Sequence, residues 1–149
     1  MAVVLDGLQD PGNAGSIVRA AEAFGATGVL FTKGTVSPFN PKTLRASAGS
    51  LFRVPFVHGL DVTLARAAFQ QRQVDVYAAM PHGARPLPQA DLRRKCALVI
   101  GSEAHGVSEA LRCGAVGISI PTMGVESLNA AVAAGILLYE AQRQRSSTP

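Results

Sequence analysis

The sequence predicts an α/β fold: a mostly parallel, six-stranded sheet with helices on both faces. Short apolar runs rich in β-branched residues alternate with longer segments of helical period, as in repeated strand–helix units. Several of these runs are apolar at successive rather than alternate positions, which is typical of strands that helices cover on both faces. With 149 residues and no recognisable linker or repeat, the chain is expected to form a single domain over residues 1–149.

The expected elements follow one another along the chain. A helix begins after the turn Asp10-Pro11-Gly12, with Asn13 as its N-terminal cap, and ends at Gly25. A helix over 62–71 is capped by Asp61, and the proline-rich stretch 81–88 is expected to be a loop. The tail 146–149 is expected to be frayed. The six strands are expected at 2–5, 29–31, 54–57, 76–79, 97–100 and 117–120, and two further helices at 41–46 and 128–145.

Composition excludes several classes of protein. Hydrophobic residues make up 48% and charged residues 16%, which excludes a disordered or low-complexity chain. No apolar run approaches the roughly 18 to 20 residues of a membrane span, and no signal peptide is recognisable, so a cytoplasmic protein without membrane contact is expected. Cys96 and Cys113 are too far apart for a zinc-binding pair and are expected to be reduced and buried; no metal is expected.

Three polar, glycine-containing loops follow strands and precede helices. They lie within residues 5–25, 100–111 and 118–140. Because parallel α/β sheets bind ligands at the carboxyl ends of their strands, these loops are the candidate site. The net charge of +4 suits a polyanionic partner but is common among soluble proteins.

Dinucleotide binding is one interpretation of the first loop. Gly12 and Gly15 give GxxG instead of GxGxxG, and no acidic residue follows the second strand to bind a ribose. Lys33 stands there instead and can contact a 2′-phosphate. An NADP-dependent oxidoreductase therefore remains open as an alternative.

Taken singly, the polar residues of these loops each have a structural explanation. Asn13 and Ser127 suit helix N-caps, with Asn129 in the first turn of the last helix. Arg19 has apolar neighbours, so its guanidinium either extends to solvent or points at an anion. Glu103 can cap backbone amides of its own loop. The argument for function rests on their combination.

That combination resembles the SpoU/TrmH family. The stretch NxGxxxR from Asn13 to Arg19, the stretch 100–107, and Ile120-Pro121 followed by Ser127-Leu128-Asn129 are similar to its three ordered motifs. The family consists of S-adenosylmethionine-dependent RNA 2′-O-ribose methyltransferases of the SPOUT superfamily, and the resemblance covers essentially the whole chain. It implies a C-terminal trefoil knot, a homodimer with its active site near the interface, and a tRNA or rRNA substrate.

The resemblance also implies roles for individual residues. Arg19 matches the arginine that acts on the ribose hydroxyl; since arginine stays protonated, it is expected to bind phosphate and stabilise the developing oxyanion. Asn13 and Glu103 match positions that orient this arginine and the substrate, and Ser127 and Asn129 match positions that line the site. Expected cofactor contacts are Gly101, Ile120, Leu128, Ala78, Ala79 and Met123, and expected RNA contacts are Lys42, Arg45 and Arg53.

Two departures from the family pattern concern the cofactor loop. Thr122 stands where a methionine is expected, and the loop 121–127 is about one residue shorter than usual. The N-terminal RNA-recognition domain of many relatives is expected to be absent. A non-catalytic RNA-binding module of the same fold is the remaining alternative, against which the joint presence of Arg19, Glu103, Ser127 and Asn129 argues.

Overall fold

A computed structural model describes residues 1–147. In this part of the chain, seven strands form one sheet of order β3-β2-β1-β6-β4-β7-β5, and all its strand pairs are parallel. The strands are β1 (Ala2–Asp6), β2 (Gly28–Thr32), β3 (Phe56–Leu60), β4 (Asp75–Ala79), β5 (Arg85–Pro86), β6 (Cys96–Gly101) and β7 (Val116–Ser119). The helices are α1 (Pro11–Ala23), α2 (Pro41–Ala46), α3 (Val62–Gln71), α4 (Glu109–Arg112) and α5 (Ala130–Ser146), with 3-10 turns η1 (Ser50–Phe52) and η2 (Leu87–Gln89).

The predicted α/β class is confirmed, but the predicted number of six strands is wrong. The seventh strand, β5, lies inside the stretch that was expected to be a loop, where Arg85 pairs with Ile118 and Pro86 with Ser119. β5 is an edge strand of two residues, and an edge is where a sheet tolerates proline. So short a strand leaves no periodic pattern in the sequence.

Strand β3 begins two residues later than predicted. The amide of Val54 donates to the Ser50 carbonyl in the preceding turn, and Pro55 has no N–H. Neither residue can therefore contribute a donor to the sheet, and pairing with β2 starts at Phe56.

Both helices that border the candidate site have a different cap from the predicted one. The N-cap of α1 is Asp10, whose Oδ1 accepts from the Asn13 amide at 2.6 Å, because Pro11 favours the first helical position. The N-cap of α5 is Asn129, and not Ser127; its side chain accepts from the amides of Ala131 and Val132. The side chain of Asn13 is thereby free for other contacts.

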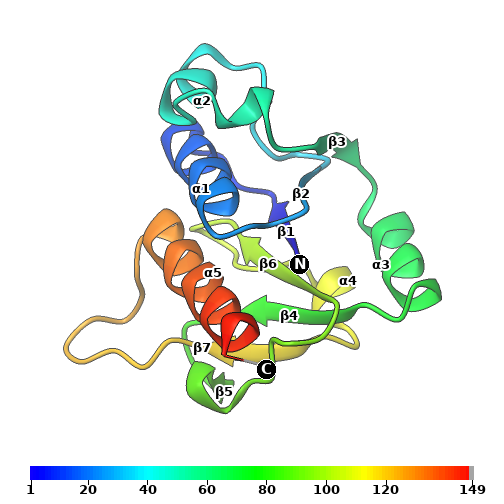
Figure 1. The fold of residues 1–149 in the computed structure, drawn as a ribbon, viewed down its shortest axis with the longest axis vertical. Coiled ribbons are helices and arrows are strands. Elements are labelled where there is room, and N and C mark those ends of the chain that lie inside the picture. The colour runs from blue at the N-terminus through cyan, green and yellow to red at the C-terminus, as the bar shows by residue number, and fades with distance from the viewer. Residues whose placement is uncertain (148–149) are drawn as a thin grey trace.

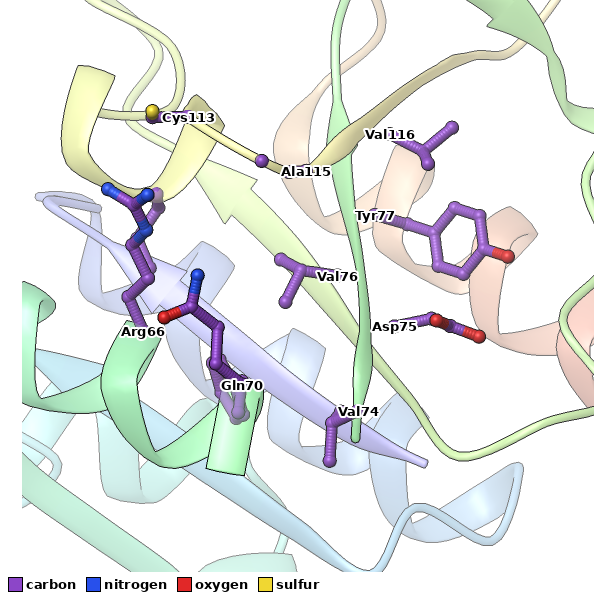
Figure 2. Close-up of a pocket in the computed structure, with 12 residues that line it drawn as sticks. Arg66, Gln70, Val74, Asp75, Val76, Tyr77, Cys113, Ala115 and Val116 are labelled. Carbon is purple, nitrogen blue, oxygen red and sulfur yellow. The ribbon is translucent and has the colours of Figure 1, made fainter. Parts of the chain in front are cut away.

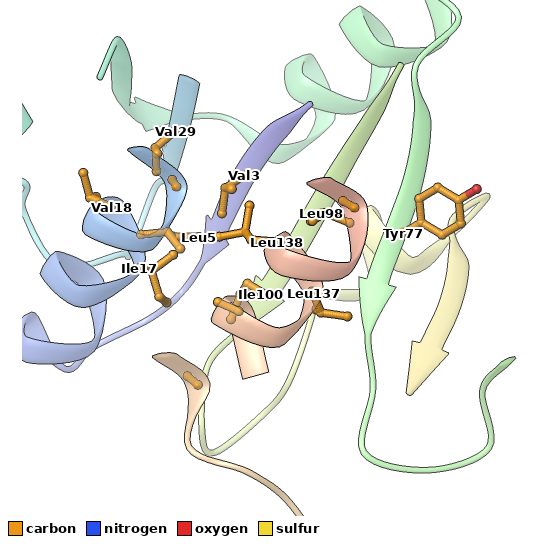
Figure 3. Packing of buried hydrophobic residues seen from close by; sticks show 14 of the residues in the cluster. Val3, Leu5, Ile17, Val18, Val29, Tyr77, Leu98, Ile100, Leu137 and Leu138 are labelled. Carbon is orange, nitrogen blue, oxygen red and sulfur yellow. The ribbon is translucent and has the colours of Figure 1, made fainter. Parts of the chain in front are cut away.

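Helices cover both faces of the sheet (Figure 1). Helices α1 and α5 lie side by side on one face, and α3 and α4 lie on the other. The alternation of side chains along β1 divides the core, since Val3 and Leu5 face α1 and α5 whereas Val4 faces α3 and α4. Figure 3 shows Leu137 and Leu138 of α5 packed over the central strands.

Three further expectations concern single features. Cys96 is buried, and burial raises the pKa of its thiol; Cys113 was expected to be buried but is exposed, because α4 ends at Arg112 just before it. Ser146 continues α5, and residues 148–149 of the expected frayed tail lie outside the described residues. No helix in residues 1–147 is long and apolar enough to cross a membrane.

Candidate active site

A pocket of about 600 Å³ opens at the carboxyl ends of the central strands. Its walls come from residues 79–81 at the end of β4, residues 100–107 at the end of β6 and residues 118, 120, 122 and 126–130 between β7 and the start of α5, with additional contacts from Arg112, Ala133 and Leu137. This volume falls within the roughly 300–1,000 Å³ typical of small-molecule sites. The pocket therefore lies at the edge where a parallel sheet is expected to bind its ligand.

The loop after β6 is held against the end of its own strand. Ser102 and Gly106 exchange two backbone hydrogen bonds, of 3.1 and 2.8 Å, which close a tight turn. This turn passes so near Gly101 that a Cβ there would lie 2.1 Å from the Gly106 carbonyl carbon and 2.2 Å from the Val107 amide nitrogen. Only glycine fits at position 101 without displacing the backbone of the pocket wall.

A buried carboxylate anchors the other end of this loop. Asp6, at the end of β1, is 5% exposed, and its Oδ2 accepts from the Ser108 amide at 2.7 Å. Its Oδ1 accepts from the Thr32 hydroxyl at 3.1 Å, which ties β2 to the same point. Sequence reasoning missed Asp6, although a carboxylate that ends an apolar strand at the ligand-binding edge was a usable signal.

Asn13, Glu103 and Asn129 form a chain of hydrogen bonds at the rim of the pocket. The side-chain nitrogen Nδ2 of Asn129 donates to Asn13 Oδ1 at 3.0 Å, and the side-chain nitrogen Nδ2 of Asn13 donates to Glu103 Oε1 at 2.8 Å. Because the Asn129 oxygen caps α5, its nitrogen must face Asn13, and this fixes the orientation of each amide in turn. Hydrogen bonds thus join three segments far apart in sequence at the carboxylate of Glu103, a residue that lines the pocket.

The chain predicts a difference between two substitutions of Asn129. Asn129→Asp keeps an oxygen to cap α5 but replaces the donor to Asn13 Oδ1 with an acceptor, so the hydrogen bond between residues 129 and 13 is lost. We expect wild-type stability and a loss of activity on the order of tenfold or more, since about 1.4 kcal/mol in the transition state corresponds to tenfold. Asn129→Ala should in addition lower the free energy of unfolding by about 1 kcal/mol through loss of the cap. Chemical denaturation and activity measurements on both variants distinguish the roles, and equal stability loss in both would contradict the assignment.

The remaining predicted catalytic residues take different positions. Ser127 is exposed and lines the pocket. Arg19 lies on the exposed side of α1, is not part of the pocket lining, and makes no hydrogen bond or ion pair within residues 1–147. The structure therefore brings Asn13, Glu103, Ser127 and Asn129 together and leaves Arg19 on a neighbouring surface.

Of the six predicted cofactor contacts, four line the pocket and two do not. The four are Gly101, Ile120, Leu128 and Ala79. Ala78 is buried among residues between the sheet and α3, and Met123 is 97% exposed at the tip of its loop. The prediction did not include Arg112 and Glu126, two side chains of opposite charge on the pocket wall. Their signal is weak in the sequence because each stands in an irregular loop or at the end of a four-residue helix.

The three predicted RNA contacts differ in whether the side chain already has an ion-pair partner. Lys42 and Arg45 are exposed on α2. Arg53 instead forms an ion pair with Glu22 at the end of α1, with an Nη2–Oε2 distance of 2.9 Å. Hydrogen bonds from Arg53, and secondarily from the Ser50 hydroxyl, lower the pKa of Glu22 to about 2. Arg53 therefore has a structural partner in addition to any role toward RNA.

A second, smaller cavity of about 240 Å³ lies at the opposite edge of the sheet (Figure 2). It is bounded by Arg66 and Gln70 of α3, the start of β4 and the segment around Cys113. This is the amino end of the strands, away from the ligand-binding edge of such sheets. None of the predicted site residues lines it. Residues 1–147 contain no group of three or more His, Cys, Asp or Glu arranged to hold a metal ion.

Comparison with known proteins identifies relatives over the whole chain. Residues 1–139 match the model of the SpoU rRNA Methylase family. An uncharacterized tRNA/rRNA methyltransferase of Synechocystis is 38% identical over 153 residues, covering 100% of this chain and 56% of its own length. The 23S rRNA (guanosine-2′-O-)-methyltransferase RlmB of Xylella fastidiosa is 38% identical over 149 residues, covering 98% of this chain and 59% of its own. The chain thus spans somewhat more than half the length of these relatives.

Solved structures agree closely with the fold. The SpoU methyltransferase AviRb from Streptomyces viridochromogenes, in complex with the cofactor AdoMet, matches with a TM-score of 0.94 and 35% identity, covering 99% of this chain and 61% of that one. A chain solved to explain the 2-OH methylation of C/U34 on tRNA matches with a TM-score of 0.84 and 31% identity, covering 99% of this chain and 97% of its own. The fold described above is therefore shared with solved methyltransferase structures.

Proposed function

The chain belongs to the SpoU rRNA Methylase family, and from this premise we propose that it methylates a ribose 2′-hydroxyl of RNA with S-adenosylmethionine as methyl donor. The observation that carries the proposal is the coincidence, at one edge of the sheet, of a cofactor-sized pocket with the chain Asn13–Glu103–Asn129. The close match to AviRb in complex with AdoMet supports the choice of cofactor. Both tRNA and rRNA fit the relatives, so the proposal names RNA as the substrate class.

The pocket fits S-adenosylmethionine in size and chemistry. Ile100, Ile118 and Ile120 supply apolar walls for an adenine ring, and Gly101 lets the backbone approach closely. Arg112 and Glu126 are suited to the carboxylate and ammonium of the amino-acid tail. We assign the cofactor to these residues together with Leu128 and Ala79.

When bound, S-adenosylmethionine would supply an electrophilic methyl group to the ribose 2′-oxygen, with S-adenosylhomocysteine as the leaving group and the hydroxyl proton passing to water. Asn13 and Asn129 hold the Glu103 carboxylate in one orientation, from which it can accept a hydrogen bond from a ribose hydroxyl. Arg19, as a permanent cation with a planar set of donors, is suited to bind the neighbouring phosphate and stabilise charge on the oxygen.

We propose that the chain acts as a homodimer, because Arg19 and the pocket do not meet within one chain. Val132, Ile136 and Tyr139 form an apolar stripe on α5, and all three are more than a third exposed. This stripe borders α1, where Phe24 contacts Tyr139 edge-on at 5.9 Å. Packing the α1–α5 layers of two copies against each other would cover the stripe and carry Arg19 toward the pocket of the partner subunit.

We also propose that the segment from β6 to α5 is threaded as the trefoil knot of the SPOUT superfamily. Two observations support this path. Strand β7 lies at the far side of β4 from β6, yet the helix that follows it returns across the sheet to pack on β6 and α1. The connection between β7 and α5, residues 120–129, forms a long loop that extends at the edge of the molecule in Figure 1.

The cofactor class is tested by calorimetric titration of the purified protein. We expect S-adenosylmethionine and S-adenosylhomocysteine to bind with one site per chain and NADPH to give no heat of binding. Binding of NADPH alone would instead favour the oxidoreductase interpretation of the first loop. As a control, Glu126→Gln should weaken S-adenosylmethionine binding while leaving the thermal unfolding curve unchanged.

A further inference from the structure

An exposed aromatic side chain stands beside β3, an edge strand of the sheet. Phe39, in the connection between β2 and α2, is 59% exposed. Its ring makes edge-to-face contacts with Phe56 at 5.9 Å and with His58 at 5.1 Å, both on strand β3. Neither partner is stacked flat on it, so a planar group can still lie against the Phe39 ring.

This aromatic group is held in place by its surroundings. The Phe39 amide donates to the Ser37 hydroxyl at 3.1 Å, and the next residue, Asn40, caps α2. Phe56 is half-buried and makes an edge-to-face contact with Phe31 of the core at 6.1 Å. The exposed ring therefore extends from the core and is not a mobile tip, which lowers the entropy cost of binding a ligand.

Positive charge lies next to these rings. Lys42 and Arg45 occupy one exposed side of α2, three residues apart, and neither makes an ion pair within residues 1–147. Asp61, the acidic group that follows β3, is engaged by Lys33 at 3.6 Å and by the cap of α3. The surface thus combines an open aromatic ring with two free cations, the combination that binds single-stranded nucleic acid.

We propose that the Phe39 ring, which His58 contacts edge-to-face, is a stacking platform for an unpaired base of the RNA substrate, while Lys42 and Arg45 bind the adjoining phosphates. The inference rests on the proposed function and deepens it, since it states that the RNA reaches the pocket as a single strand. The platform borders β3, and in the strand order β3-β2-β1-β6 this strand lies three positions from β6, which carries the pocket wall. At about 4.8 Å per strand the lateral separation of β3 and β6 is roughly 14 Å, which a strand of a few nucleotides spans.

The absence of tryptophan from the sequence makes a direct test possible. Phe39→Trp places a single fluorescent reporter on the platform. Phe52→Trp is the matched control, because Phe52 is 83% exposed but lies in η1, next to Arg53 and its ion pair with α1. Titration with oligouridylate of about 15 nucleotides should quench the fluorescence of Phe39→Trp and leave that of Phe52→Trp nearly unchanged.

Binding is also measured by the fluorescence anisotropy of the same oligonucleotide carrying a fluorescent label at one end. Phe39→Ala should raise the dissociation constant by about fivefold or more, as expected for loss of one stacked base, whereas Phe52→Ala should not. Lys42→Ala should weaken binding and reduce the slope of log affinity against log salt by about one.

Three results would overturn the proposal. RNA binding without quenching of Phe39→Trp would remove the platform while leaving the proposed methyltransferase function intact. Equal binding of an RNA duplex, with equal quenching, would contradict recognition of unpaired bases. Failure of the wild-type chain to bind any RNA, with S-adenosylmethionine still bound, would count against both the platform and the RNA substrate.

Discussion

Arg19→Ala is expected to reduce methyl transfer by on the order of a hundredfold or more, the effect typical of removing one group that stabilises a developing oxyanion. The side chain is exposed and makes no hydrogen bond or ion pair within residues 1–147, so its removal breaks none of either kind in the folded chain. The melting curve and the affinity for S-adenosylmethionine should therefore match the wild type. Single-turnover kinetics and calorimetry on the same preparation measure these quantities separately. Activity within a few-fold of wild type would contradict the role assigned to Arg19.

Arg19→Lys is the matched control for this experiment. Lysine keeps the positive charge but loses the planar set of five donors, so partial activity between that of Arg19→Ala and wild type is expected. Full activity of Arg19→Lys would show that charge alone suffices.

Complementation then locates where Arg19 acts. If it serves the pocket of the partner subunit, co-expression of Arg19→Ala with Asn129→Asp should give activity above that of either variant alone. About a quarter of wild-type activity is expected, since half of the dimers are mixed and each mixed dimer contains one intact site. No restoration in isolated mixed dimers would place Arg19 in the site of its own chain.

Gly101→Ala is expected to abolish measurable S-adenosylmethionine binding and to lower the free energy of unfolding by about 1–3 kcal/mol, the cost of overpacking a closely packed site. The added methyl would lie 2.1 Å from the Gly106 carbonyl carbon, and backbone cannot move aside as a flexible side chain can. The turn 102–106, which forms one wall of the pocket, must be displaced. Calorimetry and chemical denaturation measure the two effects.

Gly28→Ala is the control for general destabilisation. Its Cβ would lie 3.2 Å from the Pro55 carbonyl oxygen, at the amino end of β2 and away from the pocket. It should lower stability slightly at most and leave S-adenosylmethionine affinity unchanged. Wild-type affinity in Gly101→Ala would show that the loop after β6 is not part of the cofactor site.

The central strands and long helices were predictable because their signals are local. Apolar runs marked β1, β2, β4 and β6, and the cap-and-periodicity signal marked α3 with its bounds and Asp61 cap as the structure has them. The N-caps of α1 and α5 were predicted wrongly because two nearby residues could each cap the helix. Asp10 and Asn129 cap their helices in preference to Asn13 and Ser127, and a sequence pattern that contains two suitable residues does not rank them.

The candidate site was predictable only as a set of segments. The motifs placed Asn13, Glu103, Ser127 and Asn129 on loops that meet at one edge, and the structure brings all four together. Their pairing by hydrogen bonds, and the anchoring of the loop by Asp6, depend on side-chain directions that spacing does not specify. The platform at Phe39 depends likewise on strand order, since His58 contacts it across elements separated by α2 and η1.

Methyl transfer to RNA, followed by chemical location of the methyl group, tests the central claim most directly. The wild-type protein is incubated with S-adenosylmethionine labelled in its methyl group and with unmodified tRNA and rRNA transcripts, and the RNA is then hydrolysed in alkali. Cleavage requires a free 2′-hydroxyl, so a methyl group on the ribose leaves the label in alkali-resistant dinucleotides. The proposed function predicts label in these dinucleotides and its loss in Arg19→Ala. Label that appears only in mononucleotides would place the methyl group on a base and contradict 2′-O-methylation.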